Sequence, residues 1–112
     1  MIMSRALRIC SSVFLYLTLI NRASAFQTDL DGQARMARAA MLARRYPEAV
    51  EIYRRMAAEL PEEPGIRFNL ALALHSMGRY GESTQVLEEL RVAQGDNRKF
   101  WFLLGEGYLK LG

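Results

Sequence analysis

The sequence predicts an all-α protein built from antiparallel helix pairs that repeat along the chain. Apolar residues recur at helical spacing in segments that are divided by short breaks containing proline or glycine. No stretch alternates apolar and polar residues with the period of two that is typical of a β-strand. Similar residues also recur 34 positions apart, as at Tyr46 and Tyr80. A period of that length predicts a helical repeat protein, in which each helix pair needs its neighbours to bury its apolar face.

The composition is that of a globular protein, with 51% hydrophobic and 24% charged residues in a chain of 112. The formal net charge of +3 comes from the first 25 residues, where Arg5, Arg8 and Arg22 are accompanied by no acid. The rest of the chain holds 12 basic and 12 acidic side chains. Because nucleic-acid binding needs clustered positive charge that neutralises phosphates, this balance argues against a DNA or RNA partner.

Residues 1–25 predict a secretory signal peptide. Arg5 and Arg8 form its positive region, Val13–Ile20 forms its apolar run, and Ala23-Ser24-Ala25 supplies the small residues that precede a cleavage site. We therefore expect an exported protein whose leader is removed after the last of these alanines.

The alternative is that the leader is retained as a membrane anchor. Ile9–Ile20 is only 12 residues long, whereas a helix needs roughly 20 apolar residues to span a bilayer. Arg22 lies very close to the expected cleavage site, so a retained membrane anchor stays an alternative. Cys10 precedes the apolar run instead of ending it, so a lipoprotein is disfavoured. Without the leader the chain has no cysteine and needs no disulfide to fold.

Threonine and proline residues predict where the first two helices after the leader begin and end. Thr28 is expected to cap a helix over about residues 30–44, because a threonine side chain can accept a hydrogen bond from the first turn. Pro47 suits the first turn of a second helix that ends near Leu60, where Pro61 follows.

The next helices are delimited by glycine and by short polar residues. A third helix should run over about residues 65–77 and stop at Gly78, which suits a left-handed cap. A fourth helix should cover about residues 81–93. Either Asp96 or Asn97 can then cap a fifth.

That fifth helix, over residues 98–111, contains the pattern W-x2-L-G-x2-Y. The period of 34 relates the sets Met36, Leu70 and Leu104; Ala37, Ala71 and Gly105; Met56 and Leu90; and Gly78 and Gly112. With this motif and this period, the chain resembles the tetratricopeptide repeat family from Leu30 to the end. The resemblance implies a right-handed α-solenoid of about two and a half repeats.

The family pattern divides the repeat domain, residues 26–112, into units 30–63, 64–97 and a partial unit 98–112. The residues that carry the repeat signature are Ala37, Tyr46, Ala49, Tyr53, Pro61, Leu70, Ala71, Gly78, Tyr80, Trp101, Leu104, Gly105 and Tyr108. The sequence departs from the pattern at Ser83, where alanine is usual.

Small residues predict where the two helices of a pair approach closely. Ala37, Ala71 and Gly105 stand on the first helices, and Ala49 and Ser83 stand on the second. Larger side chains at these positions would push the pair apart.

The last helix is expected to expose an apolar face, because the second helix of its unit is not in the sequence. We interpret the chain as a fragment of a longer repeat protein. The alternative is that this end docks on a partner or on another copy of the chain.

The sequence argues against an enzyme, a metal site or a cofactor. It holds one histidine, His75, and no combination of serine, histidine and acid at a spacing that would assemble a catalytic site. The family pattern places His75 on the groove side of its helix, although a lone helical histidine is more often a polar surface residue.

In the family, the first helices of successive units line a concave groove. Transferred to this sequence, the partner-binding candidates are Arg38, Met41, Phe68, Asn69, Leu72, His75, Lys99, Phe102 and Glu106. This mixture of apolar and charged side chains suits an extended segment or a helix of a partner. Of the five positions with which chaperone-binding members clamp a C-terminal carboxylate, only Asn69 and Lys99 agree, so a chaperone adaptor is disfavoured.

The sequence therefore predicts a non-enzymatic scaffold or adaptor that is exported to the cell envelope and binds a protein or peptide, with no small-molecule substrate. The alternative is that it is the repeat segment of a larger exported enzyme, such as a peptidase, whose catalytic domain lies outside this chain. Thirteen arginines against two lysines are typical of a GC-rich bacterial genome, which favours a periplasm over secretion.

Overall fold

The computed structural model describes residues 2–112, with side chains from residue 10 onward. It contains the helices α1 (Ile2–Leu42), α2 (Tyr46–Glu59), α3 (Pro64–Ser76), α4 (Tyr80–Glu89) and α5 (Arg98–Leu111), and no strand occurs within residues 2–112. The chain divides into two units, Met1–Gly32 and Gln33–Gly112, and α1 contributes residues to both.

The first unit contains α1 residues only, and Thr28 lies inside this helix. Its Oγ1 donates to the carbonyl oxygen of Ser24 at 2.9 Å, a bond to the preceding helical turn. The prediction that Thr28 caps a helix was wrong, because residues 22–31 contain no glycine or proline that would interrupt α1. Arg5 and Arg8 of the predicted leader lie outside the residues whose side chains are described. Over residues 2–112, no helix combines the length and the apolar character that crossing a membrane requires.

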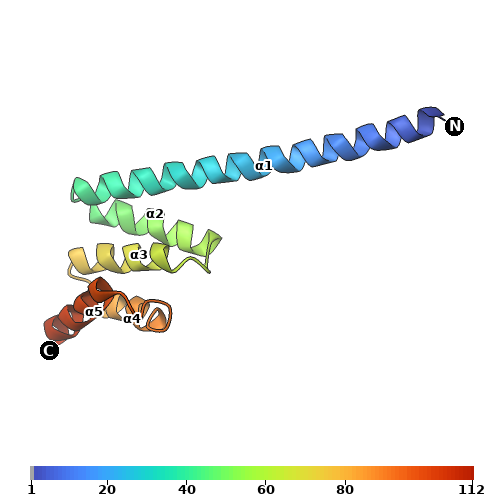
Figure 1. The fold of residues 1–112 in the computed structure, drawn as a ribbon. Coiled ribbons are helices and arrows are strands. Elements are labelled where there is room, and N and C mark those ends of the chain that lie inside the picture. The colour runs from blue at the N-terminus through green and yellow to red at the C-terminus, as the bar shows by residue number, and fades with distance from the viewer. Residues whose placement is uncertain (1) are drawn as a thin grey trace. The chain divides into compact units, whose positions relative to one another are not determined.

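In the second unit, α2, α3, α4 and α5 pack in sequence order, each against the next (Figure 1). A first core joins the end of α1 to α2 and α3, through Ala37, Ala40, Ala49, Val50, Ile52, Tyr53, Met56, Leu70, Ala73 and Leu74. A second core joins α3 to α4 and α5, through Ala71, Leu87, Leu90, Phe100, Leu103 and Leu104. Each core is shared by three consecutive helices that short turns connect. The predicted all-α solenoid is therefore confirmed.

The period of 34 residues is also visible in the backbone of the turns. Arg44 has a φ of 59°, and Gly78, 34 positions later, has a φ of 80°. In each turn the N–H of the following residue donates to the carbonyl five positions earlier, at 2.8 Å and 2.9 Å. This is the left-handed helix stop that was predicted at Gly78. Arg44 adopts the same backbone conformation, although a residue with a Cβ atom disfavours the left-handed region.

The start of α5 matches its prediction. The side chain of Asn97 accepts hydrogen bonds from the backbone N–H groups of Lys99 and Phe100, at 3.0 Å and 3.3 Å. These bonds satisfy two of the N–H groups that the first turn of a helix leaves without a partner.

Helix α4 is shorter than the predicted span of residues 81–93. It ends at Glu89, and the N–H of Leu90 donates to the carbonyl three residues earlier at 3.0 Å. Val92 is exposed, so no apolar contact favours another helical turn there. The indole N–H of Trp101 instead donates to the carbonyl of Gly95 at 2.7 Å, which ties the loop to α5.

The close approach of α4 and α5 occurs at Gly107. A Cβ built on Gly107 would lie 2.6 Å from Cγ2 of Thr84, whereas a Cβ on Gly105 would meet nothing within 4 Å. Gly105, predicted to permit close packing within its own unit, is exposed in the described chain. The contact of α5 with the preceding unit thus depends on Gly107, for which the sequence pattern made no prediction. The prediction for Gly105 concerns the second helix of its own unit and is not tested by this contact.

Candidate binding groove

A pocket of about 260 Å³ lies between the end of α1, α2 and α3. Its lining residues are Arg38, Met41, Leu42, Tyr53, Asn69 and Leu72. Four of the predicted partner-binding residues, Arg38, Met41, Asn69 and Leu72, thus come together in one place. Helical spacing explains this, because residues three apart on α1 and three apart on α3 share a face.

A second pocket, of about 220 Å³, adjoins the first and shares Arg38, Tyr53 and Asn69 with it. Its other lining residues are Ala34, Met56, Glu63, Gly65 and Ile66. We call the two pockets together the groove. All of its residues belong to the second unit.

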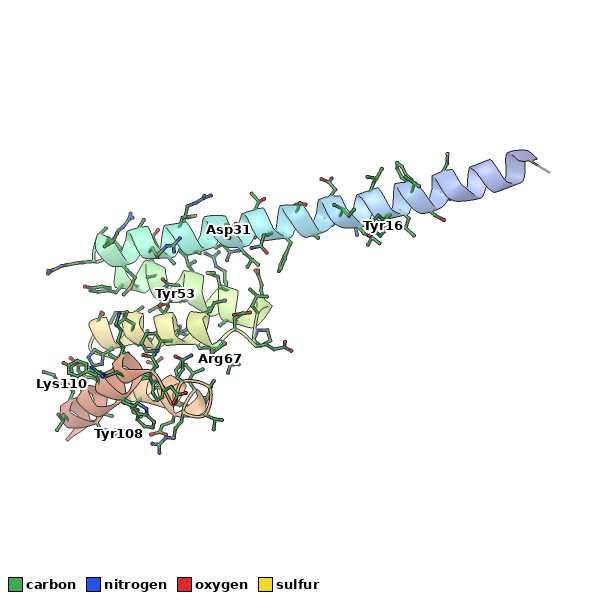
Figure 2. The ribbon with its side chains drawn as sticks, in the orientation of Figure 1. Tyr16, Asp31, Tyr53, Arg67, Tyr108 and Lys110 are labelled. Atoms are coloured by element: carbon green, nitrogen blue, oxygen red, sulfur yellow. The ribbon has the colours of Figure 1, made fainter. Side chains whose placement is uncertain are left out.

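Tyr53 on α2 (labelled in Figure 2) also forms part of the groove. The sequence pattern assigned this residue only to the repeat signature. Its ring belongs to the first core and the residue is 4% exposed, yet it lines both pockets. Burial raises the pKa of the Tyr53 phenol, and the positive charge of Arg38 lowers it to a smaller extent. The phenol therefore stays protonated at neutral pH and can donate a hydrogen bond. Arg38 and Tyr53 line both pockets together.

His75 on α3 and Glu106 on α5, both predicted partner-binding residues, pair with each other outside the groove. His75 Nε2 lies 3.2 Å from Glu106 Oε2, and the ring of Tyr80 meets the His75 ring edge-on at 4.9 Å between centroids. The side chain of His75 is only 12% exposed. It is therefore a packed, paired residue and not the polar surface residue that a lone helical histidine suggested.

The other partner-binding candidates lie outside the two pockets. Phe68 is partly buried against the second core. Lys99 and Phe102 lie on α5, where Phe102 is 72% exposed. Figure 2 shows Tyr108 and Lys110 farther along the same helix. The structure thus gathers Arg38 and Met41 of α1 with Asn69 and Leu72 of α3 in the groove. Phe68 and His75 of α3, like the candidates of α5, lie outside it.

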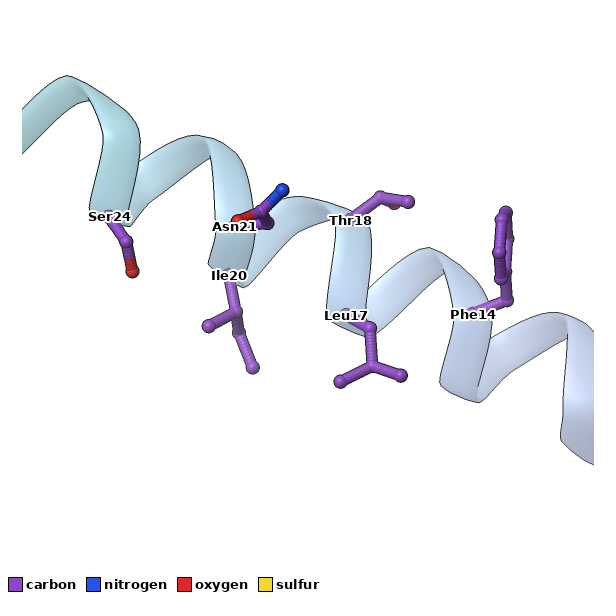
Figure 3. Close-up of a pocket in the computed structure, with 6 residues that line it drawn as sticks. All are labelled: Phe14, Leu17, Thr18, Ile20, Asn21 and Ser24. Carbon is purple, nitrogen blue, oxygen red and sulfur yellow. The ribbon is translucent and has the colours of Figure 1, made fainter.

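A hollow of about 470 Å³ also occurs in the first unit, on α1 alone. Phe14, Leu17, Thr18, Ile20, Asn21 and Ser24 line it, along one side of a single helix (Figure 3). A surface formed by one helix within the predicted leader does not enclose a ligand, so the groove of the second unit is the better candidate. Among the described residues, no group of three or more His, Cys, Asp and Glu side chains could hold a metal ion.

Comparison with known proteins gives one finding of similarity. A family model described as tetratricopeptide repeat matches residues 40–106, which is more than half of the chain. No curated protein and no solved structure matches the chain. The matched segment includes α2, α3 and α4 and most of α5, and with them most of the groove.

Proposed function

This chain belongs to the tetratricopeptide repeat family, and from that premise we propose that it is an exported, non-enzymatic adaptor that holds a segment of a partner protein in its groove. Repeats of this family generally mediate protein–protein interactions and are typically not catalytic. The observation that carries the proposal is the pair of adjoining pockets between α1, α2 and α3.

The size and the lining of the pockets favour a peptide over a small molecule. Small-molecule sites usually enclose about 300–1,000 Å³, whereas these pockets hold about 260 and 220 Å³. Two small pockets side by side suit successive side chains of a peptide segment. Their apolar residues provide area to bury, and the few polar groups provide orientation.

Selection from a random peptide library tests the binding function. The full chain is immobilised and compared with Leu72→Trp, which fills the first pocket, and with Val92→Trp, which adds the same side chain at an exposed loop position. We expect related peptides to be enriched by the parent and by Val92→Trp, and to be lost with Leu72→Trp. Equal enrichment by all three would place binding elsewhere, and no enrichment by the parent would contradict the peptide-binding function.

Export forms the second part of the proposal, and it rests on the leader pattern of residues 1–25. If the leader is removed in a bacterial host, N-terminal sequencing of the exported protein should give Phe26 as the first residue. A mature protein that still carries Arg5 and Arg8 would contradict the cleaved signal and support a retained anchor.

A further inference from the structure

The two pockets of the groove meet at three polar side chains, those of Arg38, Tyr53 and Asn69, which line both. Apolar residues lie on either side of them: Met41, Leu42 and Leu72 in the first pocket, and Ala34, Met56 and Ile66 in the second. The polar groups are therefore at the centre of an otherwise largely apolar surface. A ligand that fills both pockets has to cross this centre.

These three side chains form no hydrogen bond or ion pair with any residue that the structure describes. Arg54 forms ion pairs with Glu51 and Glu82, whereas Arg38 has no carboxylate of a described residue within 4.0 Å. The hydroxyl of Tyr53 likewise bonds to no described residue, and it is open to the groove. The centre of the groove thus offers hydrogen-bond donors from all three side chains, and Arg38 adds a positive charge that no described carboxylate pairs.

Resting on the function proposed above, we infer that the groove selects a partner segment in which an aspartate or glutamate side chain lies between apolar residues. The carboxylate pairs with the Arg38 guanidinium and accepts hydrogen bonds from the Tyr53 hydroxyl and the Asn69 amide. The apolar neighbours of the acid fill the two pockets.

The arrangement of the groove favours a side-chain carboxylate within a segment over a carboxylate at the end of a chain. The pockets continue on both sides of the polar centre, so a ligand that ended there would leave one pocket empty. Glu63 lines the second pocket and would repel an acid placed at that end. The only position in the groove that favours a negative charge is therefore beside Arg38.

A charge-reversal selection tests this inference. Random peptides are displayed as N-terminal fusions, so that none offers a free C-terminal carboxylate, and are selected on the full chain, on Arg38→Glu and on Arg55→Glu. Arg55 is an exposed residue of α2 that lines neither pocket, so its variant makes the same charge change outside the groove. We expect the parent and Arg55→Glu to enrich peptides with an acid between apolar residues. Arg38→Glu should enrich peptides with a lysine or arginine in place of the acid.

Binding of one enriched peptide then measures the contribution of the carboxylate. Replacing its acid by the matching amide should weaken binding about three- to tenfold, because the pair with the exposed Arg38 is partly screened by solvent. The same replacement should have a clearly smaller effect on binding to Arg38→Gln, in which only the hydrogen bonds from Tyr53 and Asn69 remain. Peptides that are enriched without an acid, or equally by the parent and Arg38→Glu, would overturn the inference while leaving peptide binding intact. Failure to enrich any peptide would instead contradict the proposed function itself.

Discussion

Ser83 Oγ donates a hydrogen bond to the carbonyl oxygen of Ala71 at 2.8 Å, in the buried contact between α3 and α4. Both residues are fully buried. Their short side chains let the two backbones come close enough for a hydroxyl of one helix to reach a carbonyl of the other. The serine that departs from the usual alanine of the family thus links the two helices of its unit.

This contact predicts that Ala71→Leu destabilises the protein. The three additional carbon atoms would push α4 away from α3 and break the hydrogen bond from Ser83, at a cost of about 1–3 kcal/mol for overpacking. Urea denaturation followed by circular dichroism measures the free energy of unfolding. Ala58→Leu, at an exposed position of α2, is the matched control and should change it little. Equal stabilities for Ala71→Leu and Ala58→Leu would refute the close packing of α3 on α4.

The two glycines of α5 should respond to alanine in opposite directions. At Gly107 the added Cβ would lie 2.6 Å from Cγ2 of Thr84, so Gly107→Ala should destabilise the protein by about 1–2 kcal/mol net. At Gly105 the Cβ would meet nothing within 4 Å, so Gly105→Ala should stabilise it by about 0.5–1 kcal/mol through helix propensity. Thermal unfolding of both variants makes the comparison.

A second substitution tests whether the contact with Thr84 is the cause. Thr84→Ser removes Cγ2 and keeps the hydroxyl that donates to the carbonyl of Tyr80. In the Thr84→Ser background, Gly107→Ala should lose most of its destabilising effect. If the effect persists, a different contact limits the distance between α4 and α5.

Arg44 should gain stability when it is replaced by glycine. A side chain in the left-handed region costs roughly 1–2 kcal/mol, and the greater freedom of glycine in the unfolded chain offsets about 0.5–1 kcal/mol of the relief. Arg44→Gly should therefore raise the free energy of unfolding by about 0.5–1 kcal/mol. Gly78→Ala, at the equivalent position of the next unit, should lower it by about 0.5–1 kcal/mol for the same two reasons in reverse. A loss of stability in Arg44→Gly would mean that the arginine side chain contributes more than its backbone costs.

The hydroxyl of Tyr108 donates to the carboxylate of Glu88 and joins α5 to α4. This bond lowers the pKa of Glu88, with a further contribution from Arg91, and raises the pKa of Tyr108. The stabilisation from Glu88 is therefore present above its ordinary pKa of 4.5 and lost as the pH falls through the lower pKa of the folded state. At the alkaline end, the contribution of Tyr108 is lost as the pH rises through its raised pKa.

The variant Tyr108→Phe isolates the contribution of the Tyr108 hydroxyl to the lowered pKa of Glu88. In Tyr108→Phe the pKa of Glu88 should rise towards its ordinary value without reaching it, because Arg91 still forms its bond at 2.8 Å. NMR titration of the Glu88 side-chain carboxyl measures the shift. Tyr46→Phe, which removes a hydroxyl elsewhere, is the control. An unchanged Glu88 pKa in Tyr108→Phe would contradict the hydrogen bond between α4 and α5.

The helix ends that the sequence predicted correctly are those that a single residue type decides. Gly78 adopts a left-handed φ of 80°, Asn97 accepts bonds from the first turn of α5, and Pro47 occupies the first turn of α2. These preferences are local, so they can be read without knowledge of the packing. The repeat pattern then placed Arg38 and Met41 of α1 on a common face with Asn69 and Leu72 of α3, where the structure locates the groove.

The features that the sequence did not predict depend on contacts between distant residues. The pairing of His75 with Glu106 requires the distance between α3 and α5, which no local pattern contains. In the sequence, Tyr53 occupies a position that the repeat pattern assigns to packing. Only the packed structure shows that this residue also lines the groove. Thr28 has the right chemistry for a cap, but a cap also needs a helix to start there, and α1 already includes it.

Mapping a bound peptide onto the chain tests the central claim most directly. Backbone amide NMR spectra of the full chain are recorded during titration with a peptide from the selection on the parent protein. We predict that the largest shift changes fall on Arg38, Met41, Tyr53, Asn69 and Leu72, with small changes at the exposed residues of α5. Changes concentrated on Phe102 and Leu109 of α5, with the groove residues unaffected, would contradict the assignment of binding to the groove.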